Sequence, residues 1–196
     1  FYGKDYIIEK ICGLSFKISA KTFFQTNSTQ AKQLFYLVKK FLEPNKEDIL
    51  YDLYTGIGTI GQILSKNVKK VVGIDIVEDS IKYATENSKL NNLSNTKYFA
   101  GDMKNVFTTQ FIEENGKPSV SIVNPPREGI DKKVIEKIID IQPKKIVYVS
   151  CNSSTLARDL VIFEKKYEIS KLQTVDMFPH TSHVENVVLL KKLIDE

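Results

Sequence analysis

Cys151 is the residue whose type and position point most directly to chemistry. It stands between a short apolar, mostly β-branched run at 146–149 and a polar stretch at 152–155 that contains good helix N-cap residues. This pattern predicts a thiol at a strand-to-helix junction, where open parallel α/β sheets bind ligands. A helix N-terminus favours the thiolate, which would make Cys151 a nucleophile. The alternative is a small buried hydrophobic residue, the commoner role of a free cysteine.

Glu185 is the second candidate, because it precedes the apolar run at 187–190. A carboxylate at the mouth of a hydrophobic element has a raised pKa and can act as a general base. A solvent-exposed glutamate at a strand end is the competing interpretation. His180, His183 and Glu185 also have a spacing that resembles metal ligands, but no further pattern supports it. We therefore expect structural histidines and no metal site.

Composition sets broad limits on the class of protein. The chain has 196 residues, with 42% hydrophobic and 27% charged, which suits one globular domain. It begins with Phe1 rather than Met, as a piece of a longer protein would. Only two cysteines are present, which argues against a disulfide framework, and no signal peptide or membrane-spanning run is visible, so we expect a cytoplasmic protein. The net charge of +4 permits a nucleic-acid partner without establishing one.

The order of the expected elements predicts an α/β fold. Two strands around a turn at Gly13 and a loop make up 1–27, the end of a preceding β-rich segment, and Asn27 or Ser28 is the candidate N-cap of the next helix. Further strands are expected at 48–53, 70–75, 96–99, 119–123, 145–150, 169–175 and 185–191, and further helices near 59–66, 78–90, 131–140 and 154–166. We predict that 28–196 forms a doubly wound Rossmann-like sheet of about seven strands with a C-terminal β-hairpin.

A glycine-rich loop follows the first strand of this sheet. The spacing Gly56-x-Gly58-x-x-Gly61 lets backbone approach a ligand closely and by itself suggests a dinucleotide. Asp52 precedes the glycines, and an acidic residue there suits a cofactor that carries an ammonium group instead of a pyrophosphate. A glycine-rich turn without a ligand is the alternative.

Two further acids and an asparagine fall at the following strand ends. Asp75 could accept hydrogen bonds from ribose hydroxyls, and Asp102 could meet an adenine amino group. Either acid alone could be a helix cap or a solvated turn residue. Asn124 precedes two prolines that fix the backbone, so it is held in the crevice. An aromatic residue after Asn-Pro-Pro would suggest methylation of an exocyclic amine, but this chain has Arg127 there.

Several motifs together resemble the RNA uracil-5-methyltransferase family. They are Phe23-Phe24-Gln25, the glycine loop, Asn124-Pro-Pro-Arg127-x-Gly129, Val147-Tyr148-x-Ser150-Cys151-Asn152-x-x-Thr155 and Asp176-x-Phe178-Pro179-His180-Thr181-x-His183-x-Glu185. The resemblance implies an S-adenosylmethionine-dependent fold with Cys151 as nucleophile and Glu185 as general base. We expect the cofactor site at Gln25, Asp52, Tyr54, Gly56, Gly58, Thr59, Asp75, Asp102 and Asn124. The chain departs from the family's usual residues at Asp75, commonly Glu, and at Asn124, often Asp.

The resemblance implies methyl transfer from S-adenosylmethionine to carbon 5 of a uridine in RNA. Because that carbon is a weak nucleophile, a thiolate must first add to carbon 6, and a base must later remove the carbon 5 proton. The loop Phe23-Phe24-Gln25 resembles the ribosomal branch of the family, so we expect 23S ribosomal RNA rather than transfer RNA as the substrate. The resemblance also implies a longer full-length protein with an N-terminal RNA-binding domain, which we do not find in this sequence. The alternatives are an amine methyltransferase acting on a nucleobase and a catalytically silent binding fragment.

Overall fold

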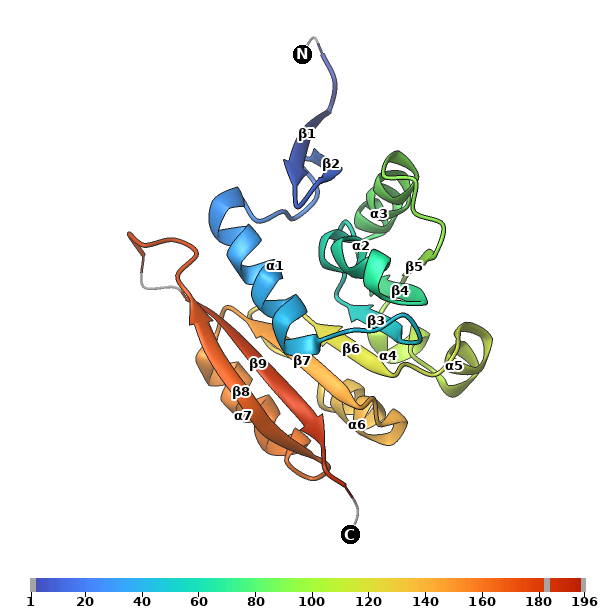
Figure 1. The fold of residues 1–196 in the computed structure, drawn as a ribbon, viewed down its shortest axis with the longest axis vertical. Helices are drawn as coiled ribbons and strands as arrows, with labels where there is room; N and C mark the ends of the chain where they lie inside the picture. Colours follow the sequence, from blue (N-terminus) through green and yellow to red (C-terminus); the bar gives the residue numbers. More distant parts are fainter. Residues whose placement is uncertain (1–2, 182–183, 195–196) are drawn as a thin grey trace.

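The computed structural model of the protein describes residues 3–181 and 184–194. Its centre is a seven-stranded sheet with the order β5-β4-β3-β6-β7-β9-β8 (Figure 1). The strands are β3 (Ile49–Leu53), β4 (Lys70–Asp75), β5 (Thr96–Ala100), β6 (Val120–Val123), β7 (Lys145–Ser150), β8 (Tyr167–Val175) and β9 (Glu185–Lys192). Strands β3 to β7 pair in parallel, whereas β9 is antiparallel to both β7 and β8. The predicted fold class, including its C-terminal hairpin, is confirmed.

The central strands are buried on both faces, which explains why they read as continuous apolar runs in the sequence. In β7, Ile146 and Tyr148 belong to one hydrophobic cluster, and Val147 and Val149 belong to the other. Side chains alternate along a strand, so each cluster lies on its own face of the sheet. The sheet must therefore be covered by helices on both sides.

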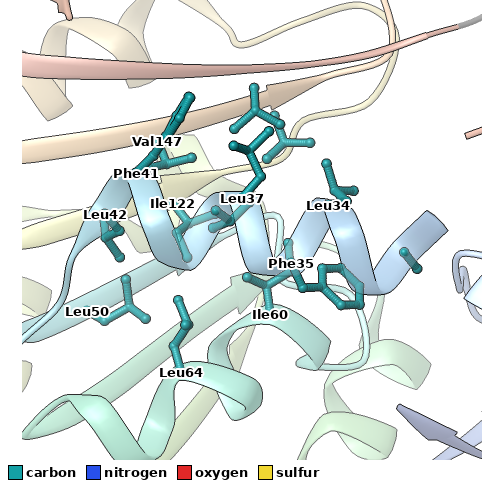
Figure 2. Packing of buried hydrophobic residues seen from close by; sticks show 14 of the residues in the cluster. Leu34, Phe35, Leu37, Phe41, Leu42, Leu50, Ile60, Leu64, Ile122 and Val147 are labelled. Atoms are coloured by element: carbon teal, nitrogen blue, oxygen red, sulfur yellow. The ribbon is translucent and has the colours of Figure 1, made fainter. Parts of the chain in front are cut away.

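Helix α1 (Ser28–Leu42) covers one face, together with α2 (Thr59–Leu64) and the short 3₁₀ helix η1 (Ser65–Asn67). Asn27 is the N-cap of α1, as the sequence suggested, because its side chain accepts a hydrogen bond from the Gln30 backbone at 3.1 Å. The buried face of α1 packs over the sheet residues Leu50, Ile122 and Val147 (Figure 2). The apolar side chains that repeat along α1 are thus buried against the sheet.

The opposite face is covered by α6 (Lys132–Ile141) and α7 (Ser153–Phe163), with α4 (Met103–Val106) and α5 (Thr109–Asn115) beside them. Helices α4 and α5 were missed in the sequence because both are short, although Asp102 and Thr108 cap their N-termini. Helix α7 ends before the predicted residue 166, since Tyr167 already lies in β8 and is buried. In the described ranges, no helix has the length and apolar character needed to span a membrane.

Strands β1 (Tyr6–Ile11) and β2 (Leu14–Ser19) form a separate hairpin at the N-terminal end, which lies against α3 (Glu78–Leu90) in Figure 1. The Asn87 amide accepts a hydrogen bond from the Lys17 backbone at 2.7 Å and donates one back at 3.2 Å. Asn91 makes the same pair of contacts with Ser15, at 2.8 and 2.9 Å. These two amides replace a neighbouring strand and fix the hairpin. A domain boundary at residue 27 stays a prediction.

Candidate active site

A cavity of about 710 Å³ opens where strands of the parallel sheet end at their carboxyl edge. Ligand pockets commonly measure about 300–1,000 Å³. Residues predicted from the sequence that line this cavity are Gln25, Tyr54, Gly56, Asp75, Asp102, Asn124, Cys151 and Glu185. The fold therefore brings both predicted catalytic residues to the same cavity as most of the predicted cofactor residues.

The Cys151 thiol and the Glu185 carboxylate come from adjacent ends of paired strands. Cys151 follows β7 directly, and Glu185 is the first residue of β9. The pairing sets Ser150 opposite Asn186, whose side-chain amide donates to the Ser150 carbonyl at 3.3 Å. This antiparallel register brings the predicted nucleophile and the predicted base together.

The electrostatics of the pair favour the neutral forms of both groups. Burial raises the pKa of the Cys151 thiol, the negative charge of Glu185 raises it further, and Arg127 lowers it. Burial alone raises the pKa of Glu185. The net direction for Cys151 is opposite to that expected from a helix N-terminus, and burial is the largest cause of the shift. A nearby carboxylate with a raised pKa is suited to exchanging protons near neutral pH.

The glycine loop and Asp75 form the other side of the cavity. One Asp75 carboxylate oxygen accepts a hydrogen bond from the Gly56 backbone at 2.8 Å, and the other accepts one from Val77 at 2.9 Å. Tyr54 and Gly56 both have positive φ angles, 63° and 55°, so the loop turns sharply beneath the cavity. Each carboxylate oxygen has a second lone pair, so Asp75 can still accept a ligand hydroxyl.

Asp52 lies beneath the same loop, with only 1% of its surface exposed. One of its oxygens accepts hydrogen bonds from Thr55 at 2.7 Å and from the Gly61 backbone at 3.0 Å. Burial raises the pKa of this carboxyl to about 6, although the two hydrogen bonds act in the opposite direction and lower the pKa. Asp52 and Thr59 line a neighbouring cavity of about 50 Å³. Direct contact of either residue with a cofactor stays a prediction.

Gly58 lines neither of these two cavities. Its close neighbours leave no room for a side chain at this position. Its φ is 80°, and an added Cβ would lie 2.8 Å from the Gln62 side chain and 2.9 Å from the Tyr98 hydroxyl. A larger residue would therefore strain the first turn of α2. A role for Gly58 in cofactor binding also stays a prediction.

Asn124 and Asp102 occupy the ends of two further strands. The Asn124 backbone donates to the Leu53 carbonyl at 3.2 Å, which extends the pairing of β6 with β3, and its half-buried side chain lines the cavity. Asp102 is the N-cap of α4 and accepts a hydrogen bond from the Lys104 backbone at 2.9 Å. The sequence left open that Asp102 is a helix cap. In the structure Asp102 caps α4 and also lines the cavity.

The described residues contain no cluster of His, Cys, Asp or Glu side chains arranged to hold a metal ion. His180 is exposed. His183, the other histidine in the motif, lies outside the described residues.

Two apolar residues at the cavity were missed by sequence reasoning. Ile76 and Val77 follow Asp75 directly, line the cavity, and leave 64% and 43% of their surfaces exposed. Apolar side chains just beyond a strand-end acid could have signalled a binding surface for a flat apolar group. Arg127 also lines the cavity, whereas the sequence had marked it only as a departure from an aromatic residue.

Comparison with solved structures places the fold among methyltransferases. The Pyrococcus abyssi tRNA (uracil-54, C5)-methyltransferase, solved in complex with S-adenosyl-L-homocysteine, is 34% identical, with a TM-score of 0.83 over 96% of this chain and 45% of that one. The M. jannaschii tRNA m1G37 methyltransferase shares the fold at 20% identity, with a TM-score of 0.74 over 99% of this chain and 59% of that one.

Sequence comparison identifies the family. Uncharacterized RNA methyltransferases of Bacteroides thetaiotaomicron and Porphyromonas gingivalis are 46% and 48% identical over 97% of this chain. The chain spans about two fifths of the length of these relatives, 42% and 41%. The model of the tRNA (uracil-5-)-methyltransferase family matches residues 2–193. The chain belongs to the tRNA (uracil-5-)-methyltransferase family.

Proposed function

We propose that the full-length protein transfers a methyl group from S-adenosylmethionine to carbon 5 of a uridine in RNA. The observation that carries this proposal is the placement of Cys151 and Glu185 at adjacent strand ends, in the cavity that also contains Asp75. Family membership and the S-adenosyl-L-homocysteine complex of the Pyrococcus abyssi relative support the choice of cofactor.

The residues around the glycine loop fit this cofactor. Asp75 would accept hydrogen bonds from the ribose hydroxyls, and the exposed faces of Ile76 and Val77 would contact the adenine. Gln25 and Asn124 offer amide groups to the same cavity. When bound, S-adenosylmethionine supplies an electrophilic methyl group.

Cys151 acts first. Its thiolate adds to carbon 6 of the uracil ring, which forms a sulfur–carbon bond and shifts the electron pair of the 5,6 double bond towards carbon 5 and the carbonyl oxygen. Carbon 5 then has the electron density needed to take the methyl group. The raised pKa of Cys151 means that the thiol must lose its proton on substrate binding, and the positive charge of Arg127 is the neighbouring charge that favours the anion.

Glu185 acts after methyl transfer. Its carboxylate removes the proton that remains on carbon 5, and the released electron pair restores the 5,6 double bond. The bond from carbon 6 to the Cys151 sulfur breaks, and the thiolate leaves. The raised pKa of Glu185 makes its carboxylate a stronger base than an exposed glutamate.

A uridine reaches this cavity only when it is unstacked, which favours loops in RNA over paired regions. Phe23 and Gln25 line this cavity, and Phe24 lines the neighbouring one. Because the motif Phe23-Phe24-Gln25 resembles the ribosomal branch of the family, we infer 23S ribosomal RNA in the cytoplasm as the substrate. The Pyrococcus abyssi relative acts on transfer RNA, which makes transfer RNA the alternative substrate. We also infer that an N-terminal RNA-binding domain of the full-length protein contributes to RNA affinity.

An RNA that carries 5-fluorouridine tests the proposal. Fluorine cannot leave carbon 5 as a proton does, so the full-length protein should remain covalently bound and migrate as a slow band on a denaturing gel. The Cys151→Ala variant should give no band, and Cys12→Ala, which removes the other thiol of this chain, should behave as wild type. Offering ribosomal and transfer RNA fragments separately identifies the substrate. An adduct that survives Cys151→Ala would refute the assigned nucleophile.

Methylation of an exocyclic amine is the second candidate, and Asn124-Pro125-Pro126 at the cavity supports it. That reaction requires neither a nucleophilic thiol nor a base at carbon 5. Retention of methyl transfer to an adenine or guanine by Cys151→Ala would favour it.

A further inference from the structure

The loop after β6, which carries Arg127 into the cavity, is tied to α7 through a buried carboxylate. Asp159 is 0% exposed. One of its oxygens accepts hydrogen bonds from the Tyr148 hydroxyl at 2.7 Å and from the Ile130 backbone at 2.8 Å. The carboxylate thus joins β7, the loop and α7 at a single point.

Arg158 satisfies the second oxygen of Asp159. Its guanidinium donates two hydrogen bonds, at 2.8 and 2.7 Å, and also donates to the Glu128 carbonyl at 2.8 Å. A buried carboxylate is tolerated when its charge is paired and its lone pairs are satisfied. The planar guanidinium can reach a carboxylate and a carbonyl at once because its donors are fixed in a fork.

Two side chains at the start of α7 hold the same loop at a neighbouring residue. The Arg127 carbonyl accepts hydrogen bonds from the Asn152 amide at 3.0 Å and from the Thr155 hydroxyl at 3.1 Å. The loop is therefore fixed at residues 127, 128 and 130 by Asn152, which is the N-cap of α7, and by side chains from the first two turns of that helix.

Gly129 shows how closely the loop approaches these groups. Its φ is 78°, and a Cβ there would lie 2.5 Å from the Arg158 guanidinium and 2.6 Å from the Asp159 carboxylate. A side chain at this position would displace the ion pair from the loop backbone. Gly129 is thus needed for the contact as well as for the turn.

We propose that Arg158 and Asp159 are positioning residues, which hold the loop 124–131 against α7 and so fix Arg127 in the cavity that contains Cys151. The proposal rests on the proposed function, in which Cys151 must become a thiolate. Arg127 is the positive group that lowers the pKa of the thiol against burial and Glu185. Neither Arg158 nor Asp159 lines the cavity, so both act through the loop.

The test measures the reactivity of Cys151 in the full-length Arg158→Ala and Asp159→Asn variants. The rate of alkylation by iodoacetamide is followed against pH and quantified on the peptide that contains Cys151, so that reaction at the exposed Cys12 does not contribute. The midpoint of the profile should rise by about 0.5 to 1 pH unit, because Arg127 no longer stabilises the thiolate. With RNA, kcat should fall by about 10- to 100-fold while KM changes by less than about threefold.

Matched variants separate positioning from general loss of structure. Thr155→Val removes one donor to the Arg127 carbonyl and should shift the midpoint in the same direction by a smaller amount. Thr85→Val removes a comparable hydroxyl bond to the Ile81 carbonyl inside α3 and should change nothing. Arg158→Lys keeps the charge without the fork and should lie between wild type and Arg158→Ala.

The thiol profile needs no RNA, so its outcome is independent of the proposed reaction. If the protein methylates no uridine but the midpoint still rises in Arg158→Ala, the proposed function fails and the positioning role stands. If Asp159→Asn does not fold, Arg158→Ala and Thr155→Val decide the question. Folded Arg158→Ala and Thr155→Val proteins with the wild-type midpoint and kcat would overturn the proposal.

Discussion

The two sides of the active-site cavity are built differently. On the cofactor side, Gly56 and Asp75 lie at consecutive strand ends of one βαβ unit. The Gly56 backbone donates a hydrogen bond to the Asp75 carboxylate, and the two residues are only 19 positions apart in the sequence. On the catalytic side, Cys151 and Glu185 meet because β9 returns antiparallel to β7, so that Asn186 contacts Ser150 across 36 positions. The first side is a local motif, whereas the second depends on how the last hairpin joins the sheet. Variants on the two sides should therefore affect different steps.

Glu185→Gln should have the largest effect, because it removes the proposed base and leaves the nucleophile in place. Turnover should fall by roughly 10²- to 10⁴-fold, while addition and methyl transfer continue. The variant should accumulate a covalent complex on ordinary uridine RNA, and mass spectrometry should find the extra methyl group in it. Normal multiple turnover by this variant would show that Glu185 is only a structural strand-end residue.

Asp75→Ala tests the cofactor side. Loss of the acceptor for buried ribose hydroxyls should weaken S-adenosylmethionine binding by about 1–3 kcal/mol. Calorimetry on the full-length protein measures this change. The alkylation profile of Cys151 should stay as in wild type, and Glu136→Ala, which removes an exposed carboxylate on α6, should alter neither quantity. Unchanged cofactor affinity in Asp75→Ala would remove Asp75 from the site.

Asp52→Asn tests whether the buried carboxyl beneath the glycine loop is costly to ionise. The pKa of Asp52 is about 6 in the folded protein against an ordinary 3.8, so the folded state holds this proton while the unfolded state has released it. The stability contribution of Asp52 therefore falls as pH rises from about 4 to about 6. Relative to Asp52→Asn, the wild-type free energy of unfolding should drop by roughly 2–3 kcal/mol over that window. Urea unfolding at pH 4 and 7 measures it; a constant difference would contradict the assignment.

The smallest effect concerns the coupling between the two catalytic residues. The negative charge of Glu185 raises the pKa of the Cys151 thiol, so Glu185→Gln should lower the midpoint of Cys151 alkylation by about half a pH unit. Asp75→Ala, on the other side of the cavity, is the control. A midpoint that rises or stays constant in Glu185→Gln would mean that the two groups are not coupled.

Much of the fold could be read from the sequence because the signals are short-range. Strands β4 and β7 and helix α3 begin and end at the predicted residues, since β-branched apolar runs and helical periodicity are local patterns. The glycine spacing likewise predicted a loop after the first strand of the sheet, and Gly56 and Gly58 in the loop after β3 have positive φ angles. The short helices α4 and α5 were missed because few residues contribute to their periodicity.

The sequence by itself determined most of the elements, apart from the short helices α4 and α5, and which polar residues stand at strand ends, because a few neighbouring residues decide both. Only the tertiary structure decided how those ends meet. The pairing of β9 with β7 places Glu185 near Cys151, and the burial this creates, rather than the helix N-terminus, sets the direction of the thiol pKa. The link between Asp159 and the loop at Gly129 depends on non-local packing in the same way. The Ile130 backbone donates to Asp159 across 29 positions, and no local sequence pattern specifies that contact. Desolvation and non-local hydrogen bonds arise only when distant segments pack together.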